Sequence, residues 1–392
     1  MKRRVVLAIA IVEVAVALTL FPVANRARLK TTDFVNFYLG ARIVRQSGGA
    51  QLYRRQTQDE AYEALVGYRP NQYFLHPPFE AAALVPLTWL SLEHAFVLWM
   101  LINIALLGGS VLWLMPCNPL VRDKPLLALL VCFGFFPTLI ALNLGQDSIL
   151  LLFILCAAYF LSCRGRELAA GLVLALLAIK FQYLAILVPL LLLSRRVRAL
   201  AGLVAGAMLL GIVSLLVTGS RGLWEYFAFV RRFDAKGGYG GLNPALMVNA
   251  RGFLAGIGAT AHVPVNSVAI GILLTAVAAV IAIRSREPDA GLLFALFVTV
   301  ALAASPYAHF PDMTIVLLPV LVALDYARAN QPRRFLTITS LAVLIVPWLL
   351  ISAGSHHWWD SRVYWLFPVI LLFGASIGWE LERRRTGGEG GS

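Results

Sequence analysis

Residues 199–218 read ALAGLVAGAMLLGIVSLLVT, twenty consecutive residues without a charged side chain. A helix of about 20 such residues is long enough to cross a hydrocarbon core of roughly 30 Å. Comparable stretches recur along the whole 392-residue chain, which is 60% hydrophobic and only 14% charged, with a mean hydropathy of +0.79. This composition excludes an ordinary soluble protein. The sequence therefore predicts an all-α fold, that of a polytopic helical membrane protein.

We predict about twelve transmembrane helices, near residues 5–24, 93–115, 125–143, 147–163, 167–181, 182–194, 199–218, 265–284, 289–305, 311–327, 334–353 and 363–380. Lys and Arg gather in alternate turns, and cytoplasmic turns of membrane proteins carry an excess of both. The turns and tail assigned to the cytoplasm contain Arg122, Lys124, Arg164, Arg166, Arg195, Arg196, Arg198, Arg284, Arg286, Arg328, Arg333, Arg334 and Arg383 to Arg385. We therefore expect a multi-pass protein of the inner (plasma) membrane with both termini in the cytoplasm.

The first predicted outer loop, residues 25–92, contains interfacial helices. Apolar residues recur at helical spacing after Asp33, which predicts an amphipathic helix lying in the membrane interface: Phe34, Phe37, Tyr38, Ala41 and Val44. Residues 79–90 number only twelve and contain Pro86. We expect a surface-lying or re-entrant helix there, because a membrane span needs more residues.

Two outer loops, 25–92 and 219–264, are expected to build the functional site of one transmembrane domain, residues 1–385. The glycine-rich tail, residues 386–392, is predicted to be disordered. The four cysteines lie within spans or at their inner ends, so we expect neither a disulfide nor a metal–thiolate site.

The formal net charge of +13 does not require a nucleic-acid partner. More than half of the basic residues lie in predicted cytoplasmic turns, where orientation and anionic lipid head groups account for them. Ten others lie in the outer loops: Arg42, Arg45, Arg54, Arg55, Arg69, Arg221, Arg231, Arg232, Lys236 and Arg251. We interpret this outer set as attraction for an anionic ligand.

Asp33 has two interpretations. A carboxylate at a membrane face, beside an interfacial helix, is a candidate general base. Asp is also a preferred N-cap residue, so the alternative is that its side chain only caps the first turn of that helix. The local sequence leaves both interpretations open.

Several other polar residues lie at the predicted outer ends of spans or in the first outer loop: His76, Gln146, Asp147, Lys180, His309 and Asp312. Each has a plainer explanation. Lys180 fits a snorkelling side chain, and Gln146 and Asp147 fit caps of the span that follows them. His76 fits simple packing beside two prolines. His309 and Asp312 fit a pair of side chains that satisfy the backbone of a turn. Their shared placement on the same side of the membrane as Asp33 is the stronger indication of a site.

Short motifs along the chain are Asp33-Phe34-x-x-Phe37-Tyr38-x-x-Ala41, Gly49-Ala50-x-Leu52-Tyr53, Tyr73-x-x-x-Pro77-Pro78 with Pro86-Leu87, Gly145-Gln146, Ala170-Gly171 before Lys180, and Ser305-Pro306 before His309. Together they resemble glycosyltransferase family 87, a GT-C superfamily family that includes polyprenol-phosphate-mannose-dependent mannosyltransferases. The resemblance covers about residues 30–325. Two departures are Phe181, where a proline usually follows the lysine, and His76, where a tyrosine more often precedes the prolines.

This resemblance implies a GT-C-type fold and an inverting enzyme. Such an enzyme transfers a hexose, here expected to be mannose, from a polyprenyl-monophosphate-sugar donor to a hydroxyl of a glycolipid, glycan or protein on the periplasmic or extracellular face. Asp33 would be the catalytic base. Lys180 and His309 match motif positions expected to bind the donor phosphate, whereas Arg232 and Arg251 join them on charge and location alone. We assign substrate binding to Tyr38, His76, Gln146 and Asp312, and we expect no metal and no cofactor.

The main alternative is a multi-span lipid or solute transporter or flippase. Twelve spans fit either class, but transporters place ionisable residues near the midplane on broken helices. Most ionisable residues here lie at the outer face, with Glu13 the main exception. A third possibility, a ligase that moves a whole lipid-linked glycan, would place its large outer loop late in the chain, whereas here the longest comes first. Activity with a single-sugar polyprenyl phosphate would separate the three.

Overall fold

The computed structural model describes residues 29–68, 73–233, 243–259, 262–284, 289–330, 333–352 and 362–388. Within these ranges the chain is helical, and the one β-type contact is an isolated bridge between Met247 and His309. The all-α prediction is therefore confirmed. The first predicted span, residues 5–24 with Glu13, lies outside the described residues.

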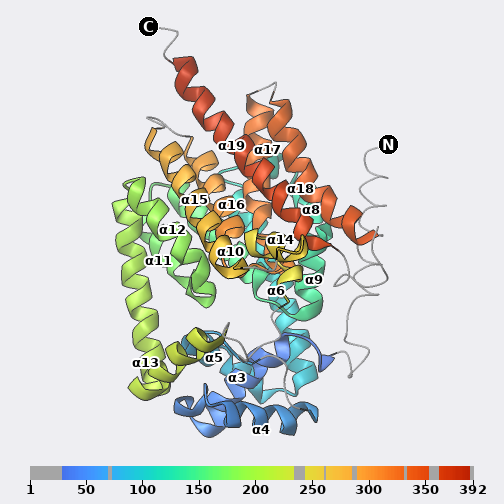
Figure 1. The fold of residues 1–392 in the computed structure, drawn as a ribbon, viewed down its shortest axis with the longest axis vertical. Helices are drawn as coiled ribbons and strands as arrows, with labels where there is room; N and C mark the ends of the chain where they lie inside the picture. Colours follow the sequence, from blue (N-terminus) through green and yellow to red (C-terminus); the bar gives the residue numbers. More distant parts are fainter. Residues whose placement is uncertain are drawn as a thin grey trace.

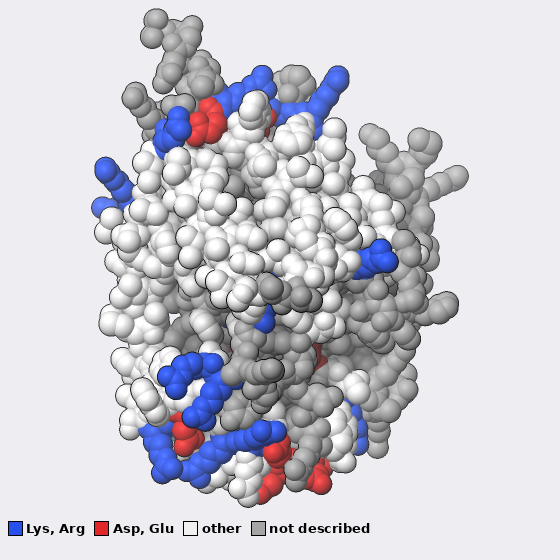
Figure 2. Space-filling model, in the orientation of Figure 1, with Lys and Arg blue, Asp and Glu red and all other residues white. Residues whose placement is uncertain are grey.

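Seven described helical stretches are long and apolar enough to cross a membrane: α6 (Leu92–Leu114), α11 to α12 (Glu167–Leu193), most of α13 (Val197–Phe233), α15 (Val263–Arg284), η6 with α17 (Phe310–Ala329), α18 (Arg334–Ser352), and η8 with most of α19 (Val363–Arg383). An eighth results if α8 (Pro125–Gly134) and α9 (Phe136–Leu144) are joined across their 63° bend. Two shorter apolar helices are α10 (Ser148–Cys163) and α16 (Ala290–Ala304). Figure 2 shows a wide band with few charged side chains between two charged ends on the face drawn. The polytopic membrane architecture is confirmed, and the count of twelve spans stays a prediction.

One of these stretches is a hairpin of three segments: α11 (Glu167–Leu174), η4 (Ala175–Lys180) and α12 (Phe181–Leu193). Its two ends meet, because Nη1 of Arg196 lies 2.7 Å from Oε1 of Glu167. A straight helix of 27 residues would hold its ends about 40 Å apart. The backbone turns at Lys180, whose φ of −122° and ψ of 73° are not helical. Lys180 therefore lies at the tip of the hairpin, where a turn was predicted.

Five short helices form one end of the molecule, at the bottom of Figure 1: α3 (Phe34–Ser47), η2 (Gly49–Gln51), α4 (Arg55–Val66), α5 (Pro78–Leu84) and η3 (Val85–Trp89). They share a hydrophobic core with residues such as Phe34 and Phe74. α13 bends at Gly219, whose φ is 67°, and Tyr226 beyond the bend joins this core. Residues 79–89 belong to α5 and η3, which are too short to cross a membrane, and Leu90 follows η3 in an extended conformation.

The other helices pack around a second, larger hydrophobic core, which includes Leu107, Phe310 and Phe373. Besides the long helices, this part contains α7 (Pro119–Asp123), η5 (Pro244–Leu246), α14 (Ala250–Gly256), η6 (Phe310–Val316), α17 (Leu317–Ala329), η8 (Val363–Trp365) and α19 (Leu366–Gly388). α19 continues into the segment 386–392 that was predicted to be a disordered tail, and residues 389–392 lie outside the described chain. The single-domain division stays a prediction.

Candidate active site

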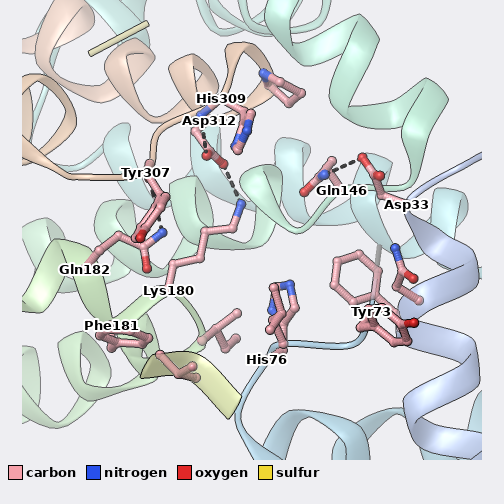
Figure 3. Close-up of a pocket in the computed structure, with 16 residues that line it drawn as sticks. Asp33, Tyr73, His76, Gln146, Lys180, Phe181, Gln182, Tyr307, His309 and Asp312 are labelled. Carbon is pink, nitrogen blue, oxygen red and sulfur yellow. Dashed lines mark hydrogen bonds and ion pairs between the residues drawn. The ribbon is translucent and has the colours of Figure 1, made fainter. Parts of the chain in front are cut away.

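Asp33 stands immediately before α3 but does not cap it. Its side chain makes no hydrogen bond to the first turn of that helix. Instead, Oδ2 of Asp33 accepts a 2.5 Å hydrogen bond from Nε2 of Gln146, as Figure 3 shows. The capping interpretation is therefore wrong.

The turn between α9 and α10 presents Gln146 to Asp33. Gly145 adopts a left-handed conformation with φ of 66°, and a Cβ there would lie 2.7 Å from Cβ of Phe34. Only glycine therefore fits this close approach to α3 without strain. The Gly145 carbonyl also accepts a 2.9 Å hydrogen bond from Nε1 of Trp99. These contacts fix the turn, and with it the donor to Asp33.

The ammonium group of Lys180 lies between two buried carboxylates. Its Nζ is 2.7 Å from Oδ1 of Asp147 and 2.5 Å from Oδ1 of Asp312. Asp312 also accepts hydrogen bonds from Oγ of Ser148 at 2.8 Å and from the backbone N–H of His309 at 3.0 Å. Lys180 thus does not snorkel, and the Asp147 side chain does not cap α10, so both of those interpretations are wrong. The turn-pair interpretation describes only part of the role of Asp312.

His76 makes polar contacts as well as packing contacts. Its Nδ1 lies 2.8 Å from Oε2 of Glu80 and 3.8 Å from Oδ2 of Asp147. The edge of its ring meets Phe37 with the ring centroids 4.8 Å apart. The interpretation of His76 as a residue that only packs is therefore wrong.

One cavity of about 240 Å³ brings most of the predicted site residues together. Its polar lining includes Asp33, His76, Gln146, Lys180, His309 and Asp312. Figure 3 shows these side chains converging from α3, from the 73–76 segment, from the α9–α10 turn, from the hairpin tip and from the 307–312 turn. The cavity lies where the two hydrophobic cores meet, because Phe37 belongs to the first core and Phe310 of the adjoining turn to the second. Apolar side chains from Leu75, Ile179, Phe181 and Val230 form another wall.

Three predicted site residues do not line this cavity. Tyr38 is buried, and its hydroxyl donates a 2.8 Å hydrogen bond to the carbonyl of Leu90, which ties α3 to the end of η3. Arg232 is exposed at the end of α13. Arg251 is buried, and its guanidinium lies 5.1 Å from the ring centre of Tyr307, which does line the cavity. The assigned roles of these three residues stay predictions.

The sequence reasoning missed several residues of the site. Glu80 is buried at 6% exposure, and only its position four residues after His76 on a helix would have indicated the pair. Asn36 lines the cavity, and its Oδ1 accepts a 2.7 Å hydrogen bond from the hydroxyl of Tyr62. Its amide nitrogen is then the end suited to donate to a ligand. Tyr73, Tyr307 and Gln182 also line the cavity.

Burial raises the pKa of Asp33 above its ordinary value, although the hydrogen bond from Gln146 and the positive charge of Lys180 act in the opposite direction. A raised pKa makes the Asp33 carboxylate a stronger base than an exposed one, and brings it closer to the operating pH at which general bases work best. Asp33 therefore combines a position on the cavity wall with a pKa raised by burial.

Three donors in the described part of the chain lie close enough to hold a metal ion. Donor atoms of His76, Glu80 and Asp147 all lie within 4.8 Å of one another. The ammonium of Lys180 already supplies a positive charge 2.7 Å from Asp147. That charge opposes a divalent cation at this place, and the prediction of a metal-free site stays a prediction.

Comparison with known proteins identifies the family of the chain. The family model described as Glycosyltransferase family 87 matches residues 74–306, which is more than half of the chain. The match includes the cavity-lining residues from Leu75 to Val230, but not Asp33, the residues of α3, Tyr73 or those of the 307–312 turn. No curated protein and no solved structure matches the sequence. The chain therefore belongs to glycosyltransferase family 87 and is a membrane glycosyltransferase.

Proposed function

We propose that this protein transfers a hexose from a polyprenyl-monophosphate-sugar donor to an acceptor hydroxyl, with inversion at the anomeric carbon. Mannose is the expected sugar, as the family resemblance implies. The observation that carries the proposal is the placement of Asp33 in one cavity with Lys180 and His309. A base and positively charged or hydrogen-bonding groups face the same small space, and both are needed when a sugar leaves a phosphate.

The reaction requires one proton acceptor. The acceptor oxygen attacks C1 of the sugar while its proton passes to the carboxylate of Asp33. The bond between C1 and the phosphate oxygen breaks, and its electron pair stays on the phosphate. Attack from the side opposite the phosphate inverts C1. The hydrogen bond from Gln146 holds the Asp33 carboxylate in place at 2.5 Å, so little reorganisation is needed during the step.

The size of the cavity supports a single-sugar donor. Ligand pockets usually range from about 300 to 1,000 Å³, and this one is about 240 Å³. That volume suits one sugar with its phosphate better than a whole lipid-linked glycan. The apolar wall of Ile179, Phe181 and Val230 provides a surface for the first part of a polyprenyl chain.

Location and partners complete the proposal. The enzyme lies in the inner (plasma) membrane with its termini in the cytoplasm, and the cavity opens on the periplasmic or extracellular face. The acceptor is a glycolipid, a glycan or a protein. The basic side chains at the cavity end of the molecule, several of which appear near the bottom of Figure 2, favour anionic partners there. Membership of a glycosyltransferase family does not favour the transporter alternative.

A direct test uses purified protein in proteoliposomes with polyprenyl-monophosphate-[14C]mannose and native membrane extract as the source of acceptors. We expect label to move into an acceptor and polyprenyl monophosphate to be released in equal amount. Transfer from GDP-mannose instead, or movement of intact donor across the membrane without cleavage, would contradict the proposal. The second of these results would support the transporter alternative.

A further inference from the structure

The ring of His76 is fixed in one position by its neighbours. The His76 carbonyl accepts a 2.6 Å hydrogen bond from the hydroxyl of Tyr53. The ring lies between two aromatic side chains, with centroid distances of 4.8 Å to Phe37 and 5.7 Å to Phe74. Pro77 follows and restricts the backbone before it. A side chain held this firmly is preorganised to make one particular contact.

Glu80 sets the direction of the two ring nitrogens. Nδ1 of His76 is 2.8 Å from Oε2 of Glu80, a buried carboxylate on the next turn of α5. An ionised carboxylate only accepts hydrogen bonds, so Nδ1 carries the hydrogen of this contact. Nε2 remains for a ligand, and Figure 3 shows the ring of His76 pointing into the cavity. The pair thus resembles a carboxylate-oriented imidazole aimed at substrate.

The charges around His76 favour its protonated form. Glu80 faces it from α5 and Asp147 from the α9–α10 turn, while Lys180 at the hairpin tip opposes them, and Asp33 lies on the same cavity wall. Burial lowers the pKa of His76, but the two carboxylates more than offset this effect, so the pKa is raised above its ordinary value. The other histidine of the cavity differs, because burial lowers the pKa of His309.

Lys180 is less available to a phosphate than its charge alone indicates. Its ammonium contacts both Asp147 and Asp312, at 2.7 and 2.5 Å, so two carboxylates share one positive charge. A phosphate that leaves in this cavity therefore needs an additional charged donor. Among the described residues, His76 lines the cavity, and the buried carboxylate of Glu80 beside it stabilises a positive charge on its ring.

We propose that His76 donates a hydrogen bond from Nε2 to an oxygen of the departing phosphate, and that Glu80 is the positioning residue that keeps the ring charged and oriented. This inference rests on the proposed function. As the bond from C1 to the phosphate oxygen breaks, the negative charge that grows on the phosphate is stabilised by the imidazolium. His76 keeps its proton, and the acceptor proton still goes to Asp33. A charged donor aimed at developing charge is among the stronger contributions to catalysis.

The test compares wild type with His76→Gln, Glu80→Gln and the control Glu60→Gln. Gln at position 76 retains a neutral donor at the reach of Nε2, and Gln at position 80 keeps the size of Glu80 without its charge. Glu60 is exposed on α4, where it accepts a hydrogen bond from Gln56, and it does not line the cavity. The readout is kcat/KM for polyprenyl-monophosphate-mannose as a function of pH, with the thermal unfolding midpoint of each variant measured alongside.

The direction of the change in kcat/KM with pH follows from the need for a protonated His76. Wild-type kcat/KM should fall as pH rises through the raised pKa of His76. Glu80→Gln should move that fall to lower pH, and His76→Gln should remove it and slow transfer on the order of 10–10²-fold. Glu60→Gln should match wild type. A wild-type profile with no fall at high pH, or unchanged profiles in folded Glu80→Gln and His76→Gln, would overturn the role of His76.

A second measurement does not depend on turnover. Protein labelled with 15N-histidine, with the His76 signal assigned from His76→Gln, should show His76 staying charged to higher pH in wild type than in Glu80→Gln. Titration of His76 below the ordinary histidine range in wild type would overturn the proposal. Failure of the proposed function is distinguishable, because wild type itself would then release no polyprenyl monophosphate.

Discussion

Nε2 of Gln146 donates a 2.5 Å hydrogen bond to Oδ2 of Asp33 across 113 residues of sequence. The bond joins the start of α3 to the turn between α9 and α10, and thereby the two hydrophobic cores of the molecule. The candidate base and the group that orients it thus come from different parts of the fold. Any account of the activity of Asp33 has to include Gln146.

Replacing Gln146 should change the pH dependence of the reaction. The hydrogen bond from Gln146 stabilises the charged form of Asp33 and lowers its pKa, while burial raises it. Gln146→Leu removes this hydrogen bond, while burial and the charge of Asp147 continue to raise the pKa of Asp33. The pKa of Asp33 should therefore rise further in this variant. Because the base must be deprotonated, the acidic limb of kcat/KM should move to higher pH. A pH–rate profile identical to that of wild type would show that this hydrogen bond does not act on the base.

The cavity residues that the sequence indicated are polar side chains at the ends of apolar runs. Asp33, Lys180 and His309 are conspicuous because a polar side chain at the end of a span needs a partner. The predicted end of the span at residue 218 also agrees with the structure, because α13 bends at Gly219. Helix existence and the polar ends of helices were therefore predictable.

The pairings inside the site were not predictable from spacing. Lys180 and Asp312 are 132 residues apart, and their contact depends on how the hairpin packs against η6. Glu80 was missed because it lies within an apolar helix. The one feature of the sequence that indicates its role is His76, four residues before it. The burial that raises the pKa of Asp33 likewise arises only when the two cores close over it.

Removing Lys180 should have its main effect on the free energy of unfolding rather than on donor binding. Asp147 and Asp312 would be left as buried carboxylates without their cation, and breaking a buried pair in this way costs about 3–5 kcal/mol. Lys180→Met should therefore lower the thermal unfolding midpoint strongly. Adding Asp147→Asn and Asp312→Asn to Lys180→Met should recover part of the loss, because the uncompensated charges are gone.

The comparison for this effect is Arg328→Met. Arg328 pairs with Asp123 at 2.6 Å, but both side chains are largely exposed. Exposed pairs are screened by solvent, so this substitution should barely change the midpoint. Equal losses in Lys180→Met and Arg328→Met would show that the Lys180 cluster does not stabilise the fold as a buried ion network.

Membrane orientation is testable with a native cysteine. Cys163 is exposed at the end of α10, next to a turn predicted to be cytoplasmic, and Glu60 is exposed on α4, which lies at the bottom of Figure 1. An impermeant maleimide applied to intact cells should label Glu60→Cys in a Cys163→Ser background. It should label Cys163 of the native protein only after permeabilisation. Reversed labelling would place the cavity in the cytoplasm, beside nucleotide-sugar donors, and would contradict a lipid-linked donor on the outer face.

In the proposed reaction, Asp33 takes the proton of the acceptor during sugar transfer from a polyprenyl monophosphate. The most direct measurement is the initial rate of that transfer by purified Asp33→Asn, beside wild type and Glu60→Gln as a matched carboxylate-to-amide control. Asp33 does not cap α3, so Asn should leave folding and donor binding intact. The rate should fall by roughly 10²–10⁴, the usual contribution of a positioned general base, while Glu60→Gln keeps the wild-type rate. Transfer by folded Asp33→Asn at close to the wild-type rate would contradict the account.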